Sequence, residues 1–504
     1  MSGIIMNTIM DFDFGRNLSW AKNQSYTAEI LQAAESRPYS SLAWATSFIV
    51  VLFFWFIRDV STLSHIPMVT QKSVWDLSGK KAKEHWMVNC RGVVKEGFKK
   101  VGATNPFRVL MDLGEMLVLP PDMANDIRNI EELSHGDFMV ETELMTEPMS
   151  DCVAKACPEL FPEDNEWHEI NMKNELLDLI ARLSSAIFLG DEEVSTDPIW
   201  LNLTKNYTVD SFIAAHQLRM YPSFMWPIMA KILPQARKVN AQFKQAEAII
   251  NPIIERRRVE KARGELERFD AVEWAEQVSQ EKGIPYSPAA AQLNMALSAI
   301  HTTADLITTT MYELLQSPKT IDLLREEIVS VISDGGLKHS SLYNLRLMDS
   351  VIKEAQRLKP VLSLNMVRKA THNIELPSGF QIPKGTRLGV PANASWDPAV
   401  FPEPEKFDPY RFVRLREQPG EEDRWQLTTL RSEQIAFGHG KHACPGRFLA
   451  ANEIKIALCH LLLKYDWKLS PSTPAPAAIS HGIMLDSDPT TKAMVRSRTA
   501  EVGL

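Results

Sequence analysis

Residues 437–448 of the chain are FGHGKHACPGRF. This stretch surrounds Cys444, one of five cysteines in the chain, with three glycines, a proline, two histidines and two basic side chains. Glycine has no side chain to clash with a neighbour, so a glycine-rich backbone can approach a large group closely. The stretch therefore predicts that a bulky ligand lies against the sulfur of Cys444.

The composition bounds the class of protein. The chain has 504 residues, of which 45% are hydrophobic, and so it can bury a large core; length alone would suggest two or three domains. A net charge of -8 and a pI near 5.9 lack the basic excess that is typical of nucleic-acid-binding proteins. We therefore expect no nucleic-acid partner, and catalysis on a neutral or apolar substrate agrees with these values.

The cysteines are odd in number and scattered, which is not the pattern of a disulfide framework and indicates a reducing compartment for the main body. A zinc site is the alternative use of these side chains. Cys152 and Cys157 have no matching second pair, and His439, His442 and Cys444 do not have the usual separations of zinc ligands. The spacing therefore disfavours zinc at both places.

Ser41–Ile57 is a segment of seventeen residues without a charge, fourteen of them apolar. As a helix it would be about 26 Å long, at the short end of what spans a bilayer. A signal peptide would place its apolar core nearer the first residue, behind a basic start, and a buried core helix is the other alternative. We predict a single transmembrane anchor.

The residues on either side of this segment bear on its orientation. Lys80, Lys81 and Lys83 favour a cytosolic location for the C-terminal side. The sequons at Asn17 and Asn23 suit a glycosylated lumenal tail. The predicted organisation is a lumenal tail over residues 1–40, the anchor over 41–57, a linker over 58–71 and one catalytic domain over 72–504.

Helical periodicity dominates the predicted domain, as in residues 166–188 and 235–258. A long helix is expected from a Ser287 cap to about Gln316, and its lack of charge between Ala289 and Ala304 indicates that it crosses the interior. Short strands are expected between Ile374 and Val390, where Pro-Ser-Gly and Pro-Lys-Gly provide turns. The body is predicted to be mainly α.

Glu354 and Arg357 are three residues apart on a predicted helix, share one face and can form an ion pair. Such pairs are common on solvated helices. Arg411, in the proline-rich segment Pro402–Phe412, offers a third partner. The order of Glu-x-x-Arg, an arginine after Phe-Asp-Pro, and the glycine-framed cysteine is far more specific than any of the three alone.

These motifs, in this order, resemble those of the cytochromes P450, the haem-thiolate monooxygenases, over nearly everything after the anchor. The resemblance implies the fold of that family, mainly α with small β-sheets, and haem b as the cofactor. The motifs are the haem-binding loop with Phe437, Gly440, Cys444 and Gly446; Glu354 and Arg357 of the paired motif; residues 407–412 before the loop; and, more loosely, residues 299–303 in the long helix.

The resemblance assigns Cys444 as the axial ligand of the haem iron, with Phe437 shielding the sulfur. We expect Gly440 and Gly446 to remove clashing side chains and to permit unusual backbone dihedrals. His442 stands where the family usually has an arginine, and we expect it on the propionate side of the haem. Arg368 is a second propionate candidate, while Glu354, Arg357 and Arg411 are expected to hold the scaffold behind the loop.

For oxygen activation the family uses an acid and an alcohol on the long helix to deliver protons. Thr303 matches the alcohol, but Thr302 stands at the acidic position and Ile300 replaces the usual glycine. Asp305 falls on a different face of the helix, so bound water or His301 is the expected substitute. Thr308–Thr310 are expected to bond back to helix carbonyls.

The chain has no flavin or nicotinamide fingerprint, so the resemblance implies electrons from a separate NADPH–cytochrome P450 reductase, with O2 and a lipophilic small molecule as substrates. We expect Lys441, Arg447 and Lys455 to form a basic face for this partner. The resemblance also implies that the protein is anchored in the endoplasmic reticulum membrane, with the catalytic domain in the cytosol. Residues 360–366 and 482–486 are expected to line the substrate pocket.

The substrate is predicted from similarity of pattern. Ala-Ile-His-Thr-Thr together with His-Ala-Cys-Pro-Gly-Arg-Phe is similar to fungal enzymes of secondary metabolism that oxidise diterpenes and indole diterpenes. We expect hydroxylation or multi-step oxidation of a bulky terpenoid or meroterpenoid intermediate. The alternatives are a polyketide-derived substrate, a haem-dependent isomerase or dehydratase without net oxygenation, and a silent haem carrier or membrane scaffold.

Overall fold

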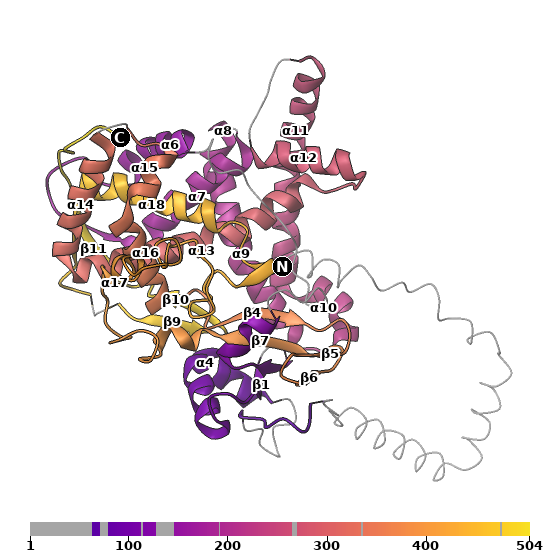
Figure 1. Ribbon diagram of the computed structural model, residues 1–504. Helices are drawn as coiled ribbons and strands as arrows, with labels where there is room; N and C mark the ends of the chain where they lie inside the picture. Colours follow the sequence, from indigo (N-terminus) through magenta and orange to yellow (C-terminus); the bar gives the residue numbers. More distant parts are fainter. Residues whose placement is uncertain are drawn as a thin grey trace, which may run out of the picture.

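In the computed structural model a long helix, α13 (Pro288–Gln316), crosses the middle of the molecule (Figure 1). It begins at the predicted cap, where Ser287 Oγ accepts a hydrogen bond from the backbone N–H of Ala290 at 3.3 Å, and Pro288 occupies the first turn. Most of its side chains are buried. The predicted central helix is thus confirmed, and it is the element around which the site is built.

The structure describes residues 63–70, 79–111, 114–127, 146–190, 192–264, 270–333, 336–473 and 476–504. Over these residues the predicted fold class, mainly α with small sheets, is confirmed. The predicted anchor, residues 41–57, lies outside them. Within the described part of the chain, no helix combines the length and the apolar character needed to cross a bilayer.

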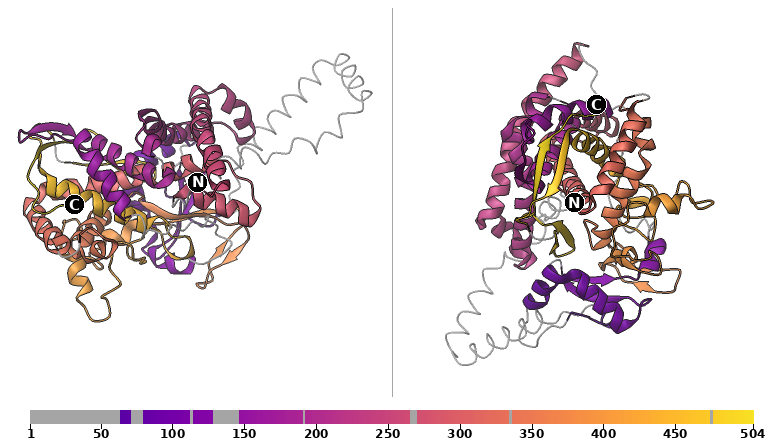
Figure 2. Two further views of the ribbon diagram at one scale, coloured as in Figure 1. Left: turned by 90° about the horizontal axis from the view of Figure 1, so that it is seen from above. Right: turned by 90° about the vertical axis from the view of Figure 1, so that its left-hand side faces the viewer.

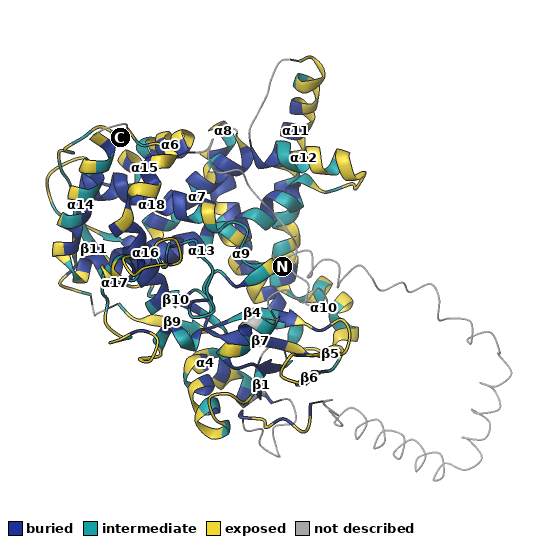
Figure 3. Cartoon of the chain, viewed as in Figure 1, coloured by how far each residue is buried: buried dark blue, intermediate teal, exposed yellow. Residues whose placement is uncertain are grey.

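The main core joins α13 to helices from both ends of the chain. In Figure 3 the buried residues concentrate on these helices, while α10–α12 carry more exposed positions. Besides α13, the α-helices of the described residues, in and outside this core, are α4 (Lys80–Val101), α5 (Ala124–Ile127), α6 (Thr146–Leu160), α7 (Met172–Leu189), α8 (Glu192–Ser195), α9 (Pro198–Arg219), α10 (Trp226–Ile232), α11 (Pro234–Ala262), α12 (Ala271–Lys282), α14 (Pro318–Ser333), α15 (His339–Asn344), α16 (Arg346–Leu358), α17 (Arg411–Arg416) and α18 (Arg447–Lys464).

The helix predicted over residues 166–188 is wrong in its first part. His168–Asn171 form strand β3, which pairs with the C-terminal strand β11 (Lys492–Ser497). Helix α7 begins only after Asn171, whose side-chain oxygen accepts from the backbone N–H of Asn174 at 3.1 Å. A tertiary strand pairing and a local N-cap together override the helical periodicity.

Most of the remaining strands lie in a second region with α4, below the helices in Figure 1 and at the lower edge of the right panel of Figure 2. Its larger sheet has the strand order β1-β2-β7-β4, in which β2 and β7 run parallel and the other neighbours antiparallel. The strands predicted between residues 374 and 390 are present. The strands are β1 (Phe107–Met111), β2 (Gly114–Val118), β4 (Leu364–Lys369), β5 (Ile374–Glu375), β6 (Gln381–Ile382) and β7 (Arg387–Pro391).

Residues 63–70 fall within the predicted linker, yet the structure packs them on this sheet. Val69 N donates to Arg108 O at 2.9 Å, Arg108 N donates to Pro67 O at 2.8 Å, and Leu63 is 4% exposed. The folded body therefore includes residues N-terminal to position 72.

The C-terminal part supplies the last strands. Strands β3, β11 and β8 (Tyr465–Leu469) form one antiparallel sheet. The hairpin of β9 (Ala478–His481) and β10 (Met484–Ser487) contacts α4 through β9 and α13 through β10. This hairpin therefore connects the central helix with the strand-rich region.

Candidate active site

Cys444 sits in the short connection between the 3-10 turn Gly440–His442 and helix α18. Its backbone N–H donates to Phe437 O at 2.7 Å, which closes the loop. The backbone N–H groups of Gly446 and Arg447 both point at the sulfur and hydrogen-bond to it. Donors of this kind stabilise a thiolate and tune its electron donation to a bound metal.

The protonation of this thiol reflects a balance of opposing effects. Burial raises the pKa of Cys444, whereas the two backbone N–H groups and the charge of Arg447 lower it by a smaller amount. The protein alone thus leaves the thiol protonated at neutral pH. Metal coordination removes the proton of a cysteine ligand, so the loop is built for a thiolate that forms on binding iron.

The glycines of the loop have different roles. Gly440 has a φ of 74°, in the left-handed region, as predicted, and Gly438, which the sequence analysis did not single out, has the same value. The prediction of an unusual dihedral is wrong for Gly446, whose φ is -79°. A Cβ at Gly446 would meet no atom within 4 Å outside the adjoining residues, so the protein itself does not require glycine there.

The structure brings together the two propionate candidates. Arg368, on β4, donates from Nη2 to the carbonyl oxygen of His442 at 3.4 Å and from Nη1 to its neighbour Val367 O at 2.9 Å. It is 7% exposed, and burial lowers the pKa of its guanidinium. Among the described residues no carboxylate pairs with it. A buried, permanently charged arginine of this kind fits an anionic group of a ligand, such as a haem propionate.

A local distortion places Arg368 beside the loop. The pairing of β4 with β7 shifts register between Asn365 and Arg368, and Met366 has a φ of 50°. Asn365 Nδ2 donates to the carbonyls of Ile435 at 2.7 Å and Ala436 at 2.9 Å, at the entry of the cysteine loop. Asn365 was not predicted from the sequence; its signal is a polar amide in the run PVLSLNM, in which Ser363 is the other polar residue.

On α13, Thr303 differs from the other threonines of the helix. Thr302 donates to Ser298 O at 2.7 Å, and Thr308, Thr309 and Thr310 each donate to the carbonyl four residues before them, as predicted for these three. Thr303 is 3% exposed, and its hydroxyl makes no hydrogen bond with the described residues. Its proton is therefore not committed to the helix backbone.

His301, one of the two expected substitutes for the missing acid, is engaged elsewhere, and so is Asp305. His301 Nε2 lies 2.9 Å from Lys205 O on α9, and burial lowers the pKa of its imidazole. Asp305 forms an ion pair with Lys359 and accepts hydrogen bonds from Ser487 on β10. Both side chains are committed to partners other than Thr303, so bound water remains the predicted proton source.

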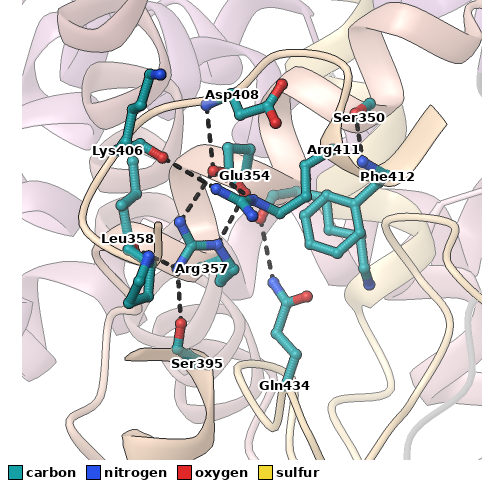
Figure 4. A network of polar contacts seen from close by, with 12 residues as sticks. Ser350, Glu354, Arg357, Leu358, Ser395, Lys406, Asp408, Arg411, Phe412 and Gln434 are labelled. Atoms are coloured by element: carbon teal, nitrogen blue, oxygen red, sulfur yellow. Dashed lines mark hydrogen bonds and ion pairs between the residues drawn. The ribbon is translucent and has the colours of Figure 1, made fainter. Parts of the chain in front are cut away.

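Glu354, Arg357 and Arg411 form one buried cluster (Figure 4). Arg357 donates to both oxygens of Glu354, at 2.8 and 2.9 Å, and Arg411 Nε donates to Glu354 Oε1 at 3.0 Å. The remaining guanidinium N–H groups reach backbone carbonyls of Ser395, Pro402, Glu403, Pro404 and Lys406. The cluster thus fixes the irregular segment that precedes the cysteine loop.

The predicted basic face needs one correction. Lys441 is exposed and Arg447 is half-buried, donating to Cys444 O at 2.9 Å. Lys455, however, is 6% exposed and binds Asp349 at 2.7 Å and Leu342 O at 3.0 Å. It is on the inner side of α18 because its position in the helix faces α15 and α16, so it cannot meet a partner protein.

The two segments expected to line the pocket lie side by side. Leu485 N donates to Val361 O at 2.9 Å, and Ser363 N donates to Ile483 O at 2.8 Å. The Ser363 hydroxyl also lies 2.9 Å from Ile483 O and 3.1 Å from the sulfur of Cys90, so buried groups of the protein already accept its proton. We call residues 361–363 and 483–485 the paired wall; its side chains, apart from Ser363, are apolar.

These residues fit haem b. Cys444 would ligate the iron, and Arg368 and the His442 segment would face the propionates. The haem, when bound, supplies the iron at which O2 is activated. The protein contributes the N–H donors at the sulfur, the buried cation, the uncommitted hydroxyl of Thr303 and the cluster of Glu354 behind the loop.

Comparison with known proteins agrees with this geometry. The family model described as "Cytochrome P450" matches residues 95–492. The chain is 64% identical over 476 residues to "Cytochrome P450 monooxygenase calE" of Penicillium decumbens, covering 88% of this chain and 92% of the relative. It is 39% identical over 473 residues to "Cytochrome P450 monooxygenase hepE" of Aspergillus oryzae, covering 86% of each. It is 37% identical over 472 residues to "Cytochrome P450 monooxygenase pyr3" of Aspergillus fumigatus, covering 87% of this chain and 90% of the relative.

The family model spans most of the chain, including the cysteine loop, the Glu354 cluster and the central helix. Members of this family carry haem b, take electrons from a redox partner and use O2 on lipophilic substrates. The chain therefore belongs to the cytochrome P450 family and is a haem-dependent monooxygenase.

Proposed function

We propose that this protein oxidises a bulky lipophilic intermediate of fungal secondary metabolism, a terpenoid or meroterpenoid, by hydroxylation or by several successive oxidations. The paired wall carries the proposal, because it presents apolar side chains and its one hydroxyl is engaged by buried groups of the protein. The charged residue of the predicted lining, Asp486, is paired with Lys173 at 2.6 Å, and a lining without an unpaired charge favours an uncharged ligand. The Penicillium and Aspergillus sources of the relatives support the fungal setting.

The first test is the carbon monoxide difference spectrum of the reduced protein in microsomes. A Soret band at the thiolate position is expected from wild type and should be lost in Cys444→Ser. A retained band in Cys444→Ser would refute this cysteine as the ligand. With the band established, terpenoid and polyketide panels are screened with NADPH–cytochrome P450 reductase for a spin shift and for product; turnover of polyketides alone would overturn the terpenoid assignment.

One observation favours a second candidate, an isomerase or dehydratase without net oxygenation. Thr302, at the position where the family has an acid, donates its proton to Ser298 O. Stoichiometry distinguishes the two candidates. Consumption of NADPH and O2 coupled to product supports the monooxygenase, whereas product formed without either supports the isomerase or dehydratase. Haem binding without any spin shift or product across the panels would favour a silent carrier.

The proposal places the catalytic domain on the cytosolic side of the endoplasmic reticulum membrane, held by residues 41–57. Two observations support this location. Leu63, six residues after the end of the apolar run, is packed on the folded body and is 4% exposed, so the run lies close to the catalytic domain in sequence. On and beside α10, Phe224, Ile228 and Ile232 are 70%, 59% and 58% exposed, an apolar surface that suits lipid. Deleting residues 1–60 should release protein from carbonate-washed membranes; unchanged retention would contradict a sole anchor.

A further inference from the structure

Asp305 connects the central helix to two other segments of the chain. It lies two residues after Thr303 on α13 and is 5% exposed. Its carboxylate accepts from the backbone N–H of Ser487 at 2.8 Å and from the Ser487 hydroxyl at 2.7 Å. It also forms an ion pair with Lys359, which follows α16. One buried carboxylate thus holds the end of β10 and the residue that leads into residues 361–363.

Ser487 and Lys359 each lie two residues outside a segment of the paired wall, Ser487 after residues 483–485 and Lys359 before residues 361–363. Lys359 Nζ donates to Leu485 O at 3.1 Å in addition to its ion pair with Asp305. The backbone bonds of the wall, Leu485 N to Val361 O and Ser363 N to Ile483 O, make its two segments one unit. Displacement of Lys359 or Ser487 would therefore move both segments together.

A second set of contacts fixes the same end of the wall from the other side. Lys173, on α7, binds Asp486 at 2.6 Å and donates to Ser487 O at 2.8 Å. Thr309, one turn after Asp305, lies 3.0 Å from the Ser487 hydroxyl. Asp305 is on the same helix as Thr303. Its contacts therefore link the paired wall to the helix that carries the hydroxyl proposed for oxygen activation.

We propose that Asp305 is a positioning residue that sets the distance and angle between the paired wall and Thr303, and so determines how a bulky ligand sits over the haem. This inference rests on the proposed function, in which the wall lines the substrate pocket. Loss of the ion pair would leave Lys359 without its carboxylate in a buried environment, and the side chain would move to reach solvent. The wall would then move with it, while the cysteine loop would stay in place.

The test compares a small and a bulky haem ligand in the full-length protein. Imidazole reports on the iron alone, whereas clotrimazole also contacts the pocket walls. In Asp305→Asn the thiolate Soret band and the imidazole dissociation constant should match wild type, and the dissociation constant of clotrimazole should rise about tenfold. Ser487→Ala, which removes one of the bonds to Asp305, should give a smaller rise in the same direction.

The matched control is Asp270→Asn. Asp270 is also a buried carboxylate, 2% exposed, with an arginine partner, Arg257, at 3.0 Å, but it touches neither segment of the wall. If Asp270→Asn selectively weakens clotrimazole to the same degree, the effect is one of general stability and the proposal fails.

Two further results would also overturn it: equal changes for the two ligands, or no change for either. Should Asp305→Asn not take up haem, Ser487→Ala carries the test, and an unchanged clotrimazole affinity there refutes the positioning role. A wild-type protein without a thiolate band would instead defeat the proposed function itself.

Discussion

Arg368 Nη2 lies 3.4 Å from the carbonyl oxygen of His442, so the buried cation of β4 and the cysteine loop are in direct contact. The guanidinium has no carboxylate partner among the described residues, and it is 7% exposed. A group that holds a permanent charge away from water needs a compensating anion. We expect the haem propionates to be the anions that compensate Arg368.

Replacing Arg368 with methionine should therefore weaken haem retention. We expect haem to transfer to apomyoglobin about tenfold faster than from wild type, because a charge-assisted hydrogen bond is lost. Lys369→Met, a change of the exposed neighbour on the same strand, is the control and should leave the rate unchanged. Equal transfer rates for Arg368→Met and wild type would rule out the propionate role.

The Glu354 cluster leads to a prediction about stability. Glu354 and Arg357 are both 0% exposed, and Arg411 is 6% exposed. In Glu354→Gln two buried guanidinium groups lose their carboxylate, which should lower the free energy of unfolding by about 3–5 kcal/mol. Denaturant titration followed by the Soret band measures the loss. The control, Glu405→Gln, breaks a surface ion pair with Arg91 and should lower the free energy of unfolding by less than about 1 kcal/mol. Similar losses of unfolding free energy in the two variants would contradict the cluster's structural role.

The hydrogen bonds on α13 separate two neighbouring threonines. Thr302 gives its proton to Ser298 O, and Thr303 makes no bond with the described residues. Thr303→Ala should therefore lower the fraction of NADPH that ends in product several-fold and raise peroxide release, since general acid assistance contributes about 10²-fold or more. Thr302→Ala and the back-bonded Thr308→Ala should retain wild-type coupling. Uncoupling by Thr302→Ala but not by Thr303→Ala would reverse the assignment.

The sequence was sufficient to predict the central helix, the cysteine loop and the Glu354 cluster, because each depends on local signals: a Ser-Pro start, closely spaced glycines, and charges three residues apart. It did not predict β3, because the pairing of His168–Asn171 with β11 joins segments more than three hundred residues apart. The burial of Lys455 was missed for a similar reason, since its partner Asp349 comes from another helix.

The site shows the same division between local and distant effects. The left-handed φ of Gly440 was predicted from the glycine-rich loop, but that of Gly438 and the ordinary φ of Gly446 were not. Asp305 was correctly placed on a different face from Thr303, yet nothing near it in sequence indicates its contacts with Lys359 and Ser487. Contacts between distant segments, which decide pocket shape, require the folded chain.

Glu453, on α18, is a buried acid outside the site, and it leads to a prediction that depends on pH. It is 1% exposed, and its described hydrogen-bond partner is the hydroxyl of Ser184 at 3.0 Å. Burial raises the pKa of its carboxyl to about 8, from an ordinary value of 4.5. The folded protein therefore keeps this proton in a pH range where the unfolded chain has already released it.

The sign of the effect follows from the two pKa values. Below pH 4.5 the carboxyl is protonated in both states and costs nothing, but between pH 4.5 and about 8 its contribution to stability falls as pH rises. One pH unit in this range corresponds to about 1.4 kcal/mol at most. Glu453→Gln should thus raise the thermal unfolding midpoint at pH 7.5 and have little effect near pH 5. Glu96→Gln, on the exposed face of α4, is the control; a gain that does not grow with pH would show that Glu453 is ionised in the folded protein.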